Sequence, residues 1–250
     1  MFDENFEVFL ADDAASKAIH FNIRYQVYCE DKKFEEASQF PDGLERDAYD
    51  QEDAVHFIVR DRLSGEWAAA MRLIINENCQ LPASEKCEFN PDFDAVGQRV
   101  IEISRLCVLK QYRGAIRLSN DKKRSDDAHT VKDNVYKIHK VDTAKNKGQE
   151  IFMGLIRVAY QYGQHNQVYF GVALMTRPLA RMLRFIGLNV NPVGSRCEFN
   201  GTRYPFRFDL VNVVSDMIRM PKKLQDFFVG GPVYKSYSAQ YTPLLLSLTR

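Results

Sequence analysis

The sequence of 250 residues predicts an α/β (α+β) domain built on a mixed, mostly antiparallel central sheet flanked by helices. Short apolar runs with two-residue alternation are typical of strands, and amphipathic runs at three- and four-residue spacing are typical of helices. They follow one another as strand, helix, three strands, helix, strand, helix and two strands. No stretch has the composition of a linker. We therefore expect one domain over residues 1–215, with residues 216–250 packed on it as a C-terminal helix and extension.

The N-terminal part predicts a strand followed by an amphipathic helix. Phe6–Leu10 is the strand, and either Asp12 or Asp13 can cap a helix over Ala14–Glu30. Apolar side chains recur at helical spacing on one face of that helix, at Ala18, Phe21, Tyr25 and Tyr28. Arg24 lies beside this face, so it is either an ordinary surface arginine or part of a site.

A polar loop over residues 31–51 follows and contains Pro41-Asp42-Gly43. Near its end, Asp47 and Asp50 are three residues apart, so a helical turn would place both carboxylates on one side. Two like charges at close range call for a cation. An arginine, a ligand amine or water can meet this need.

Val55–Asp61 and Trp67–Ile75 predict two strands joined by a hairpin turn at Arg62-Leu63-Ser64-Gly65. Arg72 interrupts the second strand among apolar neighbours. Its guanidinium is therefore expected either at an edge of the sheet or paired with an acid.

The next strand, Val100–Leu109, is the centre of the predicted sheet, because it is long, aliphatic and free of Gly and Pro. Alternation places Glu102 and Ser104 on one face and Arg105 on the other, unless a bulge turns it round. A buried carboxylate is costly unless it is paired or its pKa rises. Glu102 is therefore either half of a structural ion pair or a catalytic group.

The composition changes at residues 110–148, which we predict to be a polar, basic insertion. Lys110–Lys147 holds eleven basic and five acidic residues and no clear hydrophobic period. This segment is either a solvated insertion or a docking surface for an acidic partner.

The C-terminal half predicts a second group of alternating helices and strands. Thr176 is the expected N-cap of the helix that ends near Phe185, and Gly187 its C′ residue. The predicted elements are a helix at Gln149–Gln164, strands at Val168–Leu174, Leu188–Val193 and Thr202–Val211, and a short helix at Leu224–Phe228.

Composition and absent motifs exclude several function classes. The formal net charge of +1 argues against nucleic-acid binding, no apolar run is long enough to span a membrane, and the N-terminus lacks the basic segment of a signal peptide. There is no phosphate-binding loop, dinucleotide fingerprint or G-x-S-x-G motif, and the five histidines show no metal-ligand pairing. We therefore expect no metal and no cofactor. The five cysteines also lack metal spacing, so we expect reduced thiols in a cytoplasmic protein.

Four short motifs, in this order, resemble those of the autoinducer synthases, which make acyl-homoserine lactones on a GNAT (N-acetyltransferase superfamily) fold. They are Arg24-Tyr25-Gln26-Val27-Tyr28, Glu45-x-Asp47-x-x-Asp50, Met71-Arg72-Leu73 and Ile101-Glu102-Ile103-Ser104-Arg105-Leu106. The resemblance covers residues 5–110 well and the remainder loosely, and it implies a GNAT-like fold. Phe34 stands where the family usually has a tryptophan. Carried over position by position, the resemblance implies a charged, substrate-binding network of Arg24, Tyr28, Phe34, Asp47, Asp50, Arg72 and Arg105.

Two departures from that family affect the expected donor and acceptor. The insertion and the long tail are similar to those of the N-acyl amino acid synthases and the exosortase-system-associated acyltransferases. The Gly-rich pyrophosphate loop of the superfamily is reduced at most to Gln111-Tyr112-Arg113-Gly114. The expected donor is therefore a thioester of an acyl carrier protein rather than of coenzyme A. Carrier proteins are acidic, and the candidate docking residues are Arg113, Arg117, Lys122, Lys123, Arg177, Arg181 and Arg184.

The resemblance thus implies transfer of a fatty acyl group from a thioester to the amine of an amino acid or similar small acceptor. Glu102 is the expected base, and Ser104 would orient the amine or donate to the leaving group. The acyl chain is expected in a groove lined by Tyr160, Tyr169 and Phe170. Two alternatives stay open: an acyl-homoserine-lactone synthase that uses S-adenosylmethionine, and an inactive acyl-binding or interaction module.

Overall fold

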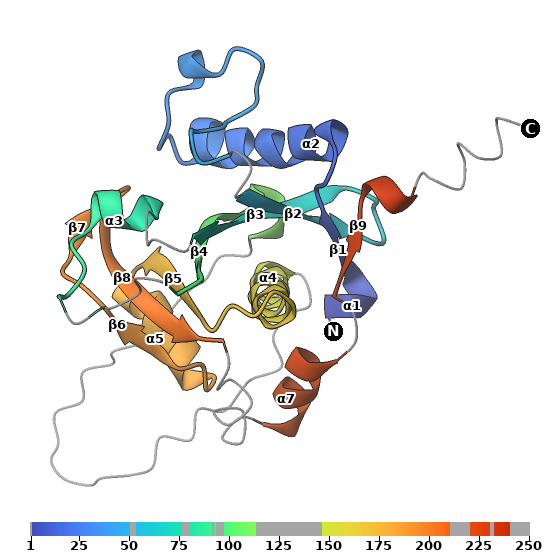
Figure 1. The fold of residues 1–250 in the computed structure, drawn as a ribbon. Helices are drawn as coiled ribbons and strands as arrows, with labels where there is room; N and C mark the ends of the chain where they lie inside the picture. The colour runs from blue at the N-terminus through green and yellow to red at the C-terminus, as the bar shows by residue number, and fades with distance from the viewer. Residues whose placement is uncertain are drawn as a thin grey trace, which may run out of the picture.

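The fold is a nine-stranded, largely antiparallel sheet with helices on both faces (Figure 1). It is seen in a computed structural model that describes residues 2–50, 54–76, 81–91, 93, 98–113, 147–210, 221–230 and 233–240. The strands lie in the order β6-β8-β5-β4-β3-β2-β1-β9, and β7 pairs with β8 alone. The β4–β5 and β1–β9 pairs are parallel and the other pairs are antiparallel. The predicted fold class is therefore confirmed.

The strands are β1 (Phe6–Leu10), β2 (Ala54–Asp61), β3 (Trp67–Asn76), β4 (Val100–Val108), β5 (Phe170–Met175), β6 (Val190–Pro192), β7 (Cys197–Glu198), β8 (Thr202–Asp209) and β9 (Tyr234–Ser236). The α-helices are α1 (Phe2–Asn5), α2 (Ala14–Tyr25), α3 (Pro82–Lys86), α4 (Lys147–His165), α5 (Arg177–Phe185) and α7 (Lys222–Val229). A π-helix covers Gln26–Asp31, and short 3₁₀ turns cover Ala37–Gln39, Lys110–Tyr112 and Ser238–Gln240.

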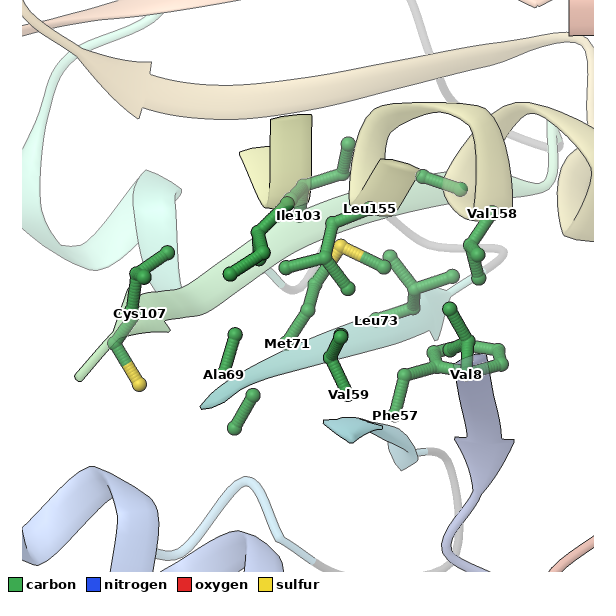
Figure 2. Close-up of a cluster of buried hydrophobic side chains, with 14 of the residues drawn as sticks. Val8, Phe57, Val59, Ala69, Met71, Leu73, Ile103, Cys107, Leu155 and Val158 are labelled. Atoms are coloured by element: carbon green, nitrogen blue, oxygen red, sulfur yellow. The ribbon is translucent and has the colours of Figure 1, made fainter. Parts of the chain in front are cut away.

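Helix α4 covers one face of the sheet, and α2 covers the other (Figure 1). Figure 2 shows Leu155 and Val158 of α4 over side chains of the central strands, among them Met71, Leu73 and Ile103. These five side chains are buried, with at most 9% of their surface exposed. Truncating one of the leucine, isoleucine or methionine side chains among them to alanine costs roughly 2–5 kcal/mol in a core of this kind. Apolar packing therefore holds α4 against its face of the sheet. The buried charged residues described below lie on the other face, under α2.

The first helix begins as predicted and changes character near its end. Asp13 is the cap, and its side chain accepts a 2.7 Å hydrogen bond from the Ser16 amide. The predicted helix over Ala14–Glu30 is α-helical only to Tyr25 and continues as a π-helix to Asp31. A π-turn shifts the following side chains around the helix axis. The three- and four-residue spacing of the predicted apolar face therefore does not hold beyond Tyr25.

A bulge in β4 gives Arg105 a direction that strict alternation does not predict. Ser104 pairs with Arg72 and Cys107 with Ala70, so Arg105 and Leu106 together stand opposite one residue of β3. Arg105 has a φ of 48°, in the left-handed region. The bulge brings its guanidinium to the α2 side of the sheet, which is the exception that the sequence analysis left open.

Strands β4 and β5 separate just after Glu102. They pair only over Val100–Phe170, Ile101–Gly171 and Glu102–Val172, although β4 runs on to Val108 and β5 to Met175. Within the described residues, no ladder joins the remaining parts of these strands. The last paired residue of β4 is therefore the expected catalytic base.

The C-terminal half follows the predicted order. Thr176 caps α5 by accepting from the Leu179 amide, and Gly187 has a φ of 97° just past its end. The strand predicted from Val168 begins at Phe170. The aromatic extension contains a strand that was not predicted, β9, which pairs with β1 at the edge of the sheet. With the sequence Tyr234-Lys235-Ser236, β9 is too short and too polar to show the alternating apolar pattern of a strand.

The prediction that all five cysteines are reduced is wrong for one pair. Cys87 and Cys197 form a disulfide that joins the end of α3 to β7, with their Cα atoms 5.3 Å apart. They are separated by 110 residues in sequence, which is why spacing gave no signal. Cys29 and Cys107 are free and buried, and Cys79 lies outside the described residues.

Candidate active site

Two arginines are completely buried between α2 and the sheet. Arg24 of α2 has 0% of its surface exposed and Arg72 of β3 has 1%. Two such cations require paired acids, because burial of an unpaired charge is very costly. The loop before β2 supplies these acids, at Glu45, Asp47 and Asp50.

Asp50 is the centre of the charged network. Its Oδ1 accepts from Arg24 Nη1 at 2.6 Å and from Arg72 Nη1 at 2.9 Å, and its Oδ2 accepts from the Asp47 amide at 2.8 Å. Burial alone would raise the pKa of Asp50, but a hydrogen bond from His56 and the two guanidinium charges lower it far below its ordinary value. Asp50 is therefore ionised at neutral pH.

Asp47 joins Arg72 to Arg105. Its Oδ1 lies 2.5 Å from Arg72 Nη1, and its Oδ2 lies 2.9 Å from Arg105 Nη2. Burial opposes ionisation of Asp47, but Arg72 and Arg105 outweigh this effect and lower its pKa. The two aspartates thus share a cation, and of the three sources that the sequence left open it is arginine.

Glu45 completes the network, although it was not among the site residues predicted from the sequence. It is 1% exposed, bonds to Arg24 Nε, and lies 3.2 Å from Arg105 Nη2. Three arginines therefore pair with three carboxylates. A fourth carboxylate, that of Glu35, has its Oε1 3.7 Å from Arg105 Nη2. Glu45 stands two residues before Asp47, in the quoted motif, so its position in that motif was the available signal.

Glu102 stands apart from the arginines and has one hydrogen-bond donor among the described residues. Its Oε2 accepts from the Ala83 amide of α3 at 2.8 Å, and its side chain is 3% exposed. Burial raises its pKa to about 7, against the opposing effects of that amide and of Arg72 and Arg105. A carboxylate with this pKa exchanges protons readily near neutral pH, as a general base must.

Ser104 lies on the same face as Glu102 and is tied to the network. Its Oγ accepts from Arg72 Nε at 3.1 Å. Because the hydroxyl oxygen receives this bond, its own hydrogen is left to donate elsewhere. A hydroxyl that can still donate a hydrogen bond therefore lies on the same face of β4 as Glu102, two residues along the strand.

Tyr28 and Phe34 form the aromatic border of the network. Arg105 lies over the Tyr28 ring, with its Cζ 5.3 Å from the ring centroid, and the Phe34 ring centroid is 6.2 Å from that of Tyr28. Phe34 is 38% exposed. An exposed aromatic ring next to a charged cluster suits contact with a ligand, which keeps the expectation for this position open.

The three residues predicted to line an acyl groove do not come together. Tyr160 is buried on α4, with its ring 6.2 Å from that of Phe228. Phe170 is buried in a separate apolar cluster with Val100 and Val172. Tyr169 is 59% exposed. The three rings therefore lie in three different environments and do not line one groove, so that prediction is wrong as a set.

Phe170 alone stays next to the base. Its apolar cluster includes Ala83, whose amide bonds to Glu102, and its ring lies 5.9 Å from that of Phe93. The side of Glu102 that faces α3 and β5 is therefore apolar, which accounts for the raised pKa.

The predicted docking residues fall into three groups. Arg113 forms an ion pair with Asp31, while Arg117, Lys122 and Lys123 lie outside the described residues. The three arginines of α5 line a pocket of about 680 Å³. Arg196 joins them, and the full lining is Arg177, Arg181, Arg184, Pro192, Gly194, Ser195, Arg196, Tyr204 and Phe206.

The described ranges contain neither a metal-binding cluster nor a membrane-spanning helix. Among those residues, no group of three or more His, Cys, Asp or Glu side chains is arranged to hold a metal ion. No helix within them has both the length and the apolar character needed to cross a membrane.

Comparisons with known proteins place this geometry in a known fold. Residues 23–119 match the acetyltransferase (GNAT) domain, and no curated protein sequence matches the chain. The solved structure of TofI with an inhibitor and MTA is 16% identical, with a TM-score of 0.57, over 87% of this chain and 99% of that one. BjaI, a CoA-dependent acyl-homoserine lactone synthase, is 14% identical, with a TM-score of 0.56, over 93% and 92%.

FeeM, an N-acyl amino acid synthase from uncultured soil microbes, is 10% identical, with a TM-score of 0.51, over 84% of this chain and 94% of its own. At such identities the likeness is one of fold. It confirms the predicted GNAT-like fold and the resemblance to autoinducer and N-acyl amino acid synthases. The acetyltransferase description of residues 23–119 confirms the prediction of an acyltransferase.

Proposed function

We propose that this chain is an N-acyltransferase that moves a fatty acyl group from a thioester to the amine of an amino acid or a similar small acceptor. The observation that carries the proposal is the position of Glu102. It is a buried carboxyl with a pKa near 7, at the residue where β4 and β5 stop pairing. A structural ion pair would instead bring an arginine to Glu102 and lower its pKa. Among the described residues, no arginine lies within 4.0 Å of it.

The reaction follows from these groups. The amine nitrogen attacks the thioester carbonyl carbon and forms the C–N bond, and Glu102 takes the proton that the amine releases, directly or through a water. The C–S bond then breaks and the thiolate leaves. In this proposal Ser104 keeps its proton and donates a hydrogen bond to the leaving sulfur, or it orients the amine. Glu102 ends the cycle protonated and returns its proton to solvent or to the thiolate.

The developing oxyanion needs N–H donors as well. The main chain at the β4 bulge, near residues 106–109, is the proposed source. The Leu109 amide is not available, because it donates to the Ala68 carbonyl at 2.9 Å. The candidate donors that remain are the main-chain amides of Leu106, Cys107 and Val108.

The charged network has a supporting role in this proposal. Its ion pairs hold the loop of Asp47 and Asp50 against α2, β3 and β4, beside Ser104. Rigid placement of the groups around an acceptor lowers the entropic cost of reaching the transition state. We assign Arg24, Asp47, Asp50, Arg72 and Arg105 to this role.

A carrier-protein thioester is the donor we favour. Four arginines converge on the pocket beside α5, and among the described residues no carboxylate lies within 4.0 Å of their side-chain nitrogens. Arg177 stacks on Tyr204, with its Cζ 4.3 Å from the ring centroid. Unpaired guanidinium groups suit an acidic partner.

Acyl-homoserine-lactone synthesis from S-adenosylmethionine is the second candidate. It is favoured by the retention of the whole charged set that the autoinducer synthases share, and by the fold likeness to BjaI. An inactive acyl-binding module is disfavoured, because binding alone requires no base of raised pKa.

A donor and acceptor panel tests the proposal. The purified chain is mixed with acyl carrier protein thioesters or acyl-CoAs, and with amino acids or S-adenosylmethionine. Released thiol is measured and products are weighed by mass spectrometry. Release that depends on an amino acid, with an N-acyl amino acid as product, supports the proposal. A lactone as product supports the second candidate. A folded chain that releases no thiol from any donor leaves the binding module.

A further inference from the structure

Two histidines are buried side by side under the charged network, and the reaction described above does not use them. His56 on β2 and His20 on α2 have ring centroids 4.6 Å apart in an edge-on arrangement. Their exposed fractions are 1% and 0%. Phe21 packs against both rings, with centroid distances of 5.5 and 5.6 Å.

Only one nitrogen of the pair has a partner among the described residues. His56 Nε2 lies 3.1 Å from Oδ1 of Asp50, whereas His56 Nδ1 and both nitrogens of His20 have none. Asp50 is ionised and can only accept hydrogen bonds, so His56 Nε2 must carry the hydrogen. This contact fixes the tautomer of His56.

The surroundings of His56 keep it neutral. The charged or titratable groups that face it are His20 and Arg24 from α2, Arg72 from β3 and Asp50 from the loop. Burial lowers the pKa of His56 below its ordinary value, and Arg24 and Arg72 act in the same direction against Asp50. A proton on Nδ1 would be buried without an acceptor in the described part of the chain.

The register of the sheet carries the effect of His56 to the site. His56 stands opposite Arg72, and Arg72 stands opposite Ser104, so the three form a row across β2, β3 and β4. Asp50 Oδ1 accepts hydrogen bonds from both His56 Nε2 and Arg72 Nη1, and Arg72 Nε donates to Ser104 Oγ.

We propose that His56 is a positioning residue for acyl transfer: its Nε2–H fixes Asp50, which fixes Arg72 and so the Ser104 hydroxyl. The inference rests on the proposed function and adds a residue that no sequence motif indicated. His20 supplies an uncharged ring against which His56 is packed.

Substitutions that separate the hydrogen bond from the packing test this role. In His56→Phe the ring stays and the donor is lost, so kcat should fall about tenfold or more, with KM for the thioester within about twofold. In His56→Gln the side-chain amide can donate to Asp50, so kcat should return to within about threefold of the unmodified chain. His20→Phe is the control and should leave kcat nearly unchanged.

The proposal is overturned if His56→Phe keeps full kcat, or if His56→Gln is as impaired as His56→Phe while both variants remain folded. A loss that appears equally in KM would indicate a general structural role.

A second measurement does not depend on activity. Nitrogen-15 NMR of the imidazole rings at pH 7 should show His56 as the neutral Nε2–H tautomer. An Nδ1–H tautomer or an imidazolium contradicts the inference even if acyl transfer is found. If no acyl transfer is found with any donor, the proposed function fails, while the tautomer still reports whether His56 is a donor to Asp50.

Discussion

The main-chain amide of Ala83 donates a 2.8 Å hydrogen bond to Oε2 of Glu102, and it is the one hydrogen bond that the described residues give to this carboxyl. Ala83 belongs to α3, a short helix that the Cys87–Cys197 disulfide joins to β7. The position of α3 therefore decides how well the expected base is held and how dry its surroundings are.

Replacing the base should stop turnover and leave the fold intact. Glu102→Gln keeps the shape and the acceptor for the Ala83 amide but removes the carboxylate. We expect kcat to fall by at least about a hundredfold. Initial rates of thiol release measure this, and Glu88→Gln, an exposed glutamate beyond α3, is the control. Retention of more than a third of the activity by the Glu102 variant would remove Glu102 from the mechanism.

The same substitution should stabilise the protein at high pH. The pKa of Glu102 is raised from 4.5 to about 7 in the folded state, which corresponds to roughly 3 kcal/mol against ionisation. This cost is absent below pH 4.5 and develops fully as pH rises through about 7. Urea unfolding at pH 5 and pH 8.5 should show that Glu102→Gln gains more stability over the unmodified chain at the higher pH than at the lower one. If the difference in unfolding free energy between the variant and the unmodified chain is the same at both pH values, the raised pKa of Glu102 is contradicted.

Activity should depend on ionised Glu102. With saturating amine corrected for its own ionisation, kcat/KM for the thioester should rise with pH and level off above about 7. Stopped-time assays across pH 5.5–9 give this profile. A profile that is flat down to pH 5.5 would mean that a group of ordinary carboxylate pKa, or no group at all, takes the proton.

The charged network should be a large source of stability. Asp50→Asn leaves Arg24 and Arg72 without their shared carboxylate, and loss of one partner of a buried ion pair costs about 3–5 kcal/mol. Because the pKa values of Asp47 and Asp50 are lowered, this stability is present above the ordinary carboxylate pKa and is lost as pH falls below about 4. Asp226→Asn, in an exposed pair with Lys222, should change the unfolding free energy by less than about 1 kcal/mol. Similar losses in the two variants would argue against the network.

The arginine pocket should matter for a carrier protein and not for the chemistry. Arg181→Glu and Arg184→Glu should raise KM for an acyl carrier protein thioester about tenfold, with kcat and KM for an acyl-pantetheine thioester unchanged. Lys223→Glu on α7 makes the same change of charge away from the pocket. Equal KM values for the carrier thioester in all three variants would place docking elsewhere.

The sequence predicted the order of the elements because each long strand and helix carries its own period. The sequence also identified Arg24, Asp47, Asp50, Arg72, Glu102 and Ser104 as candidates for one site, because a motif resemblance relates residues that are distant along the chain. The disulfide and β9 depend on contacts between distant segments, which leave no local pattern. Arg105 was predicted only conditionally, because a bulge of one residue reverses the face of its side chain.

The contact between His56 and Asp50 could not be predicted from the sequence either. A lone histidine in an apolar strand is usually a core residue, and nothing in its spacing points to Asp50, six residues earlier in a loop. The acyl groove failed for a related reason. Tyr160, Tyr169 and Phe170 were chosen by size and proximity to the predicted sheet, and neither property says which face a ring occupies.

Acceptor-dependent thiol release tests the central claim most directly. The purified chain is given an acyl carrier protein thioester, with and without a mixture of amino acids, and free thiol and product mass are followed together. We expect release to be faster with acceptor, matched mole for mole by an N-acyl amino acid, and absent in Glu102→Gln. Release at the same rate without acceptor, or in the Glu102 variant, would contradict N-acyl transfer at this site.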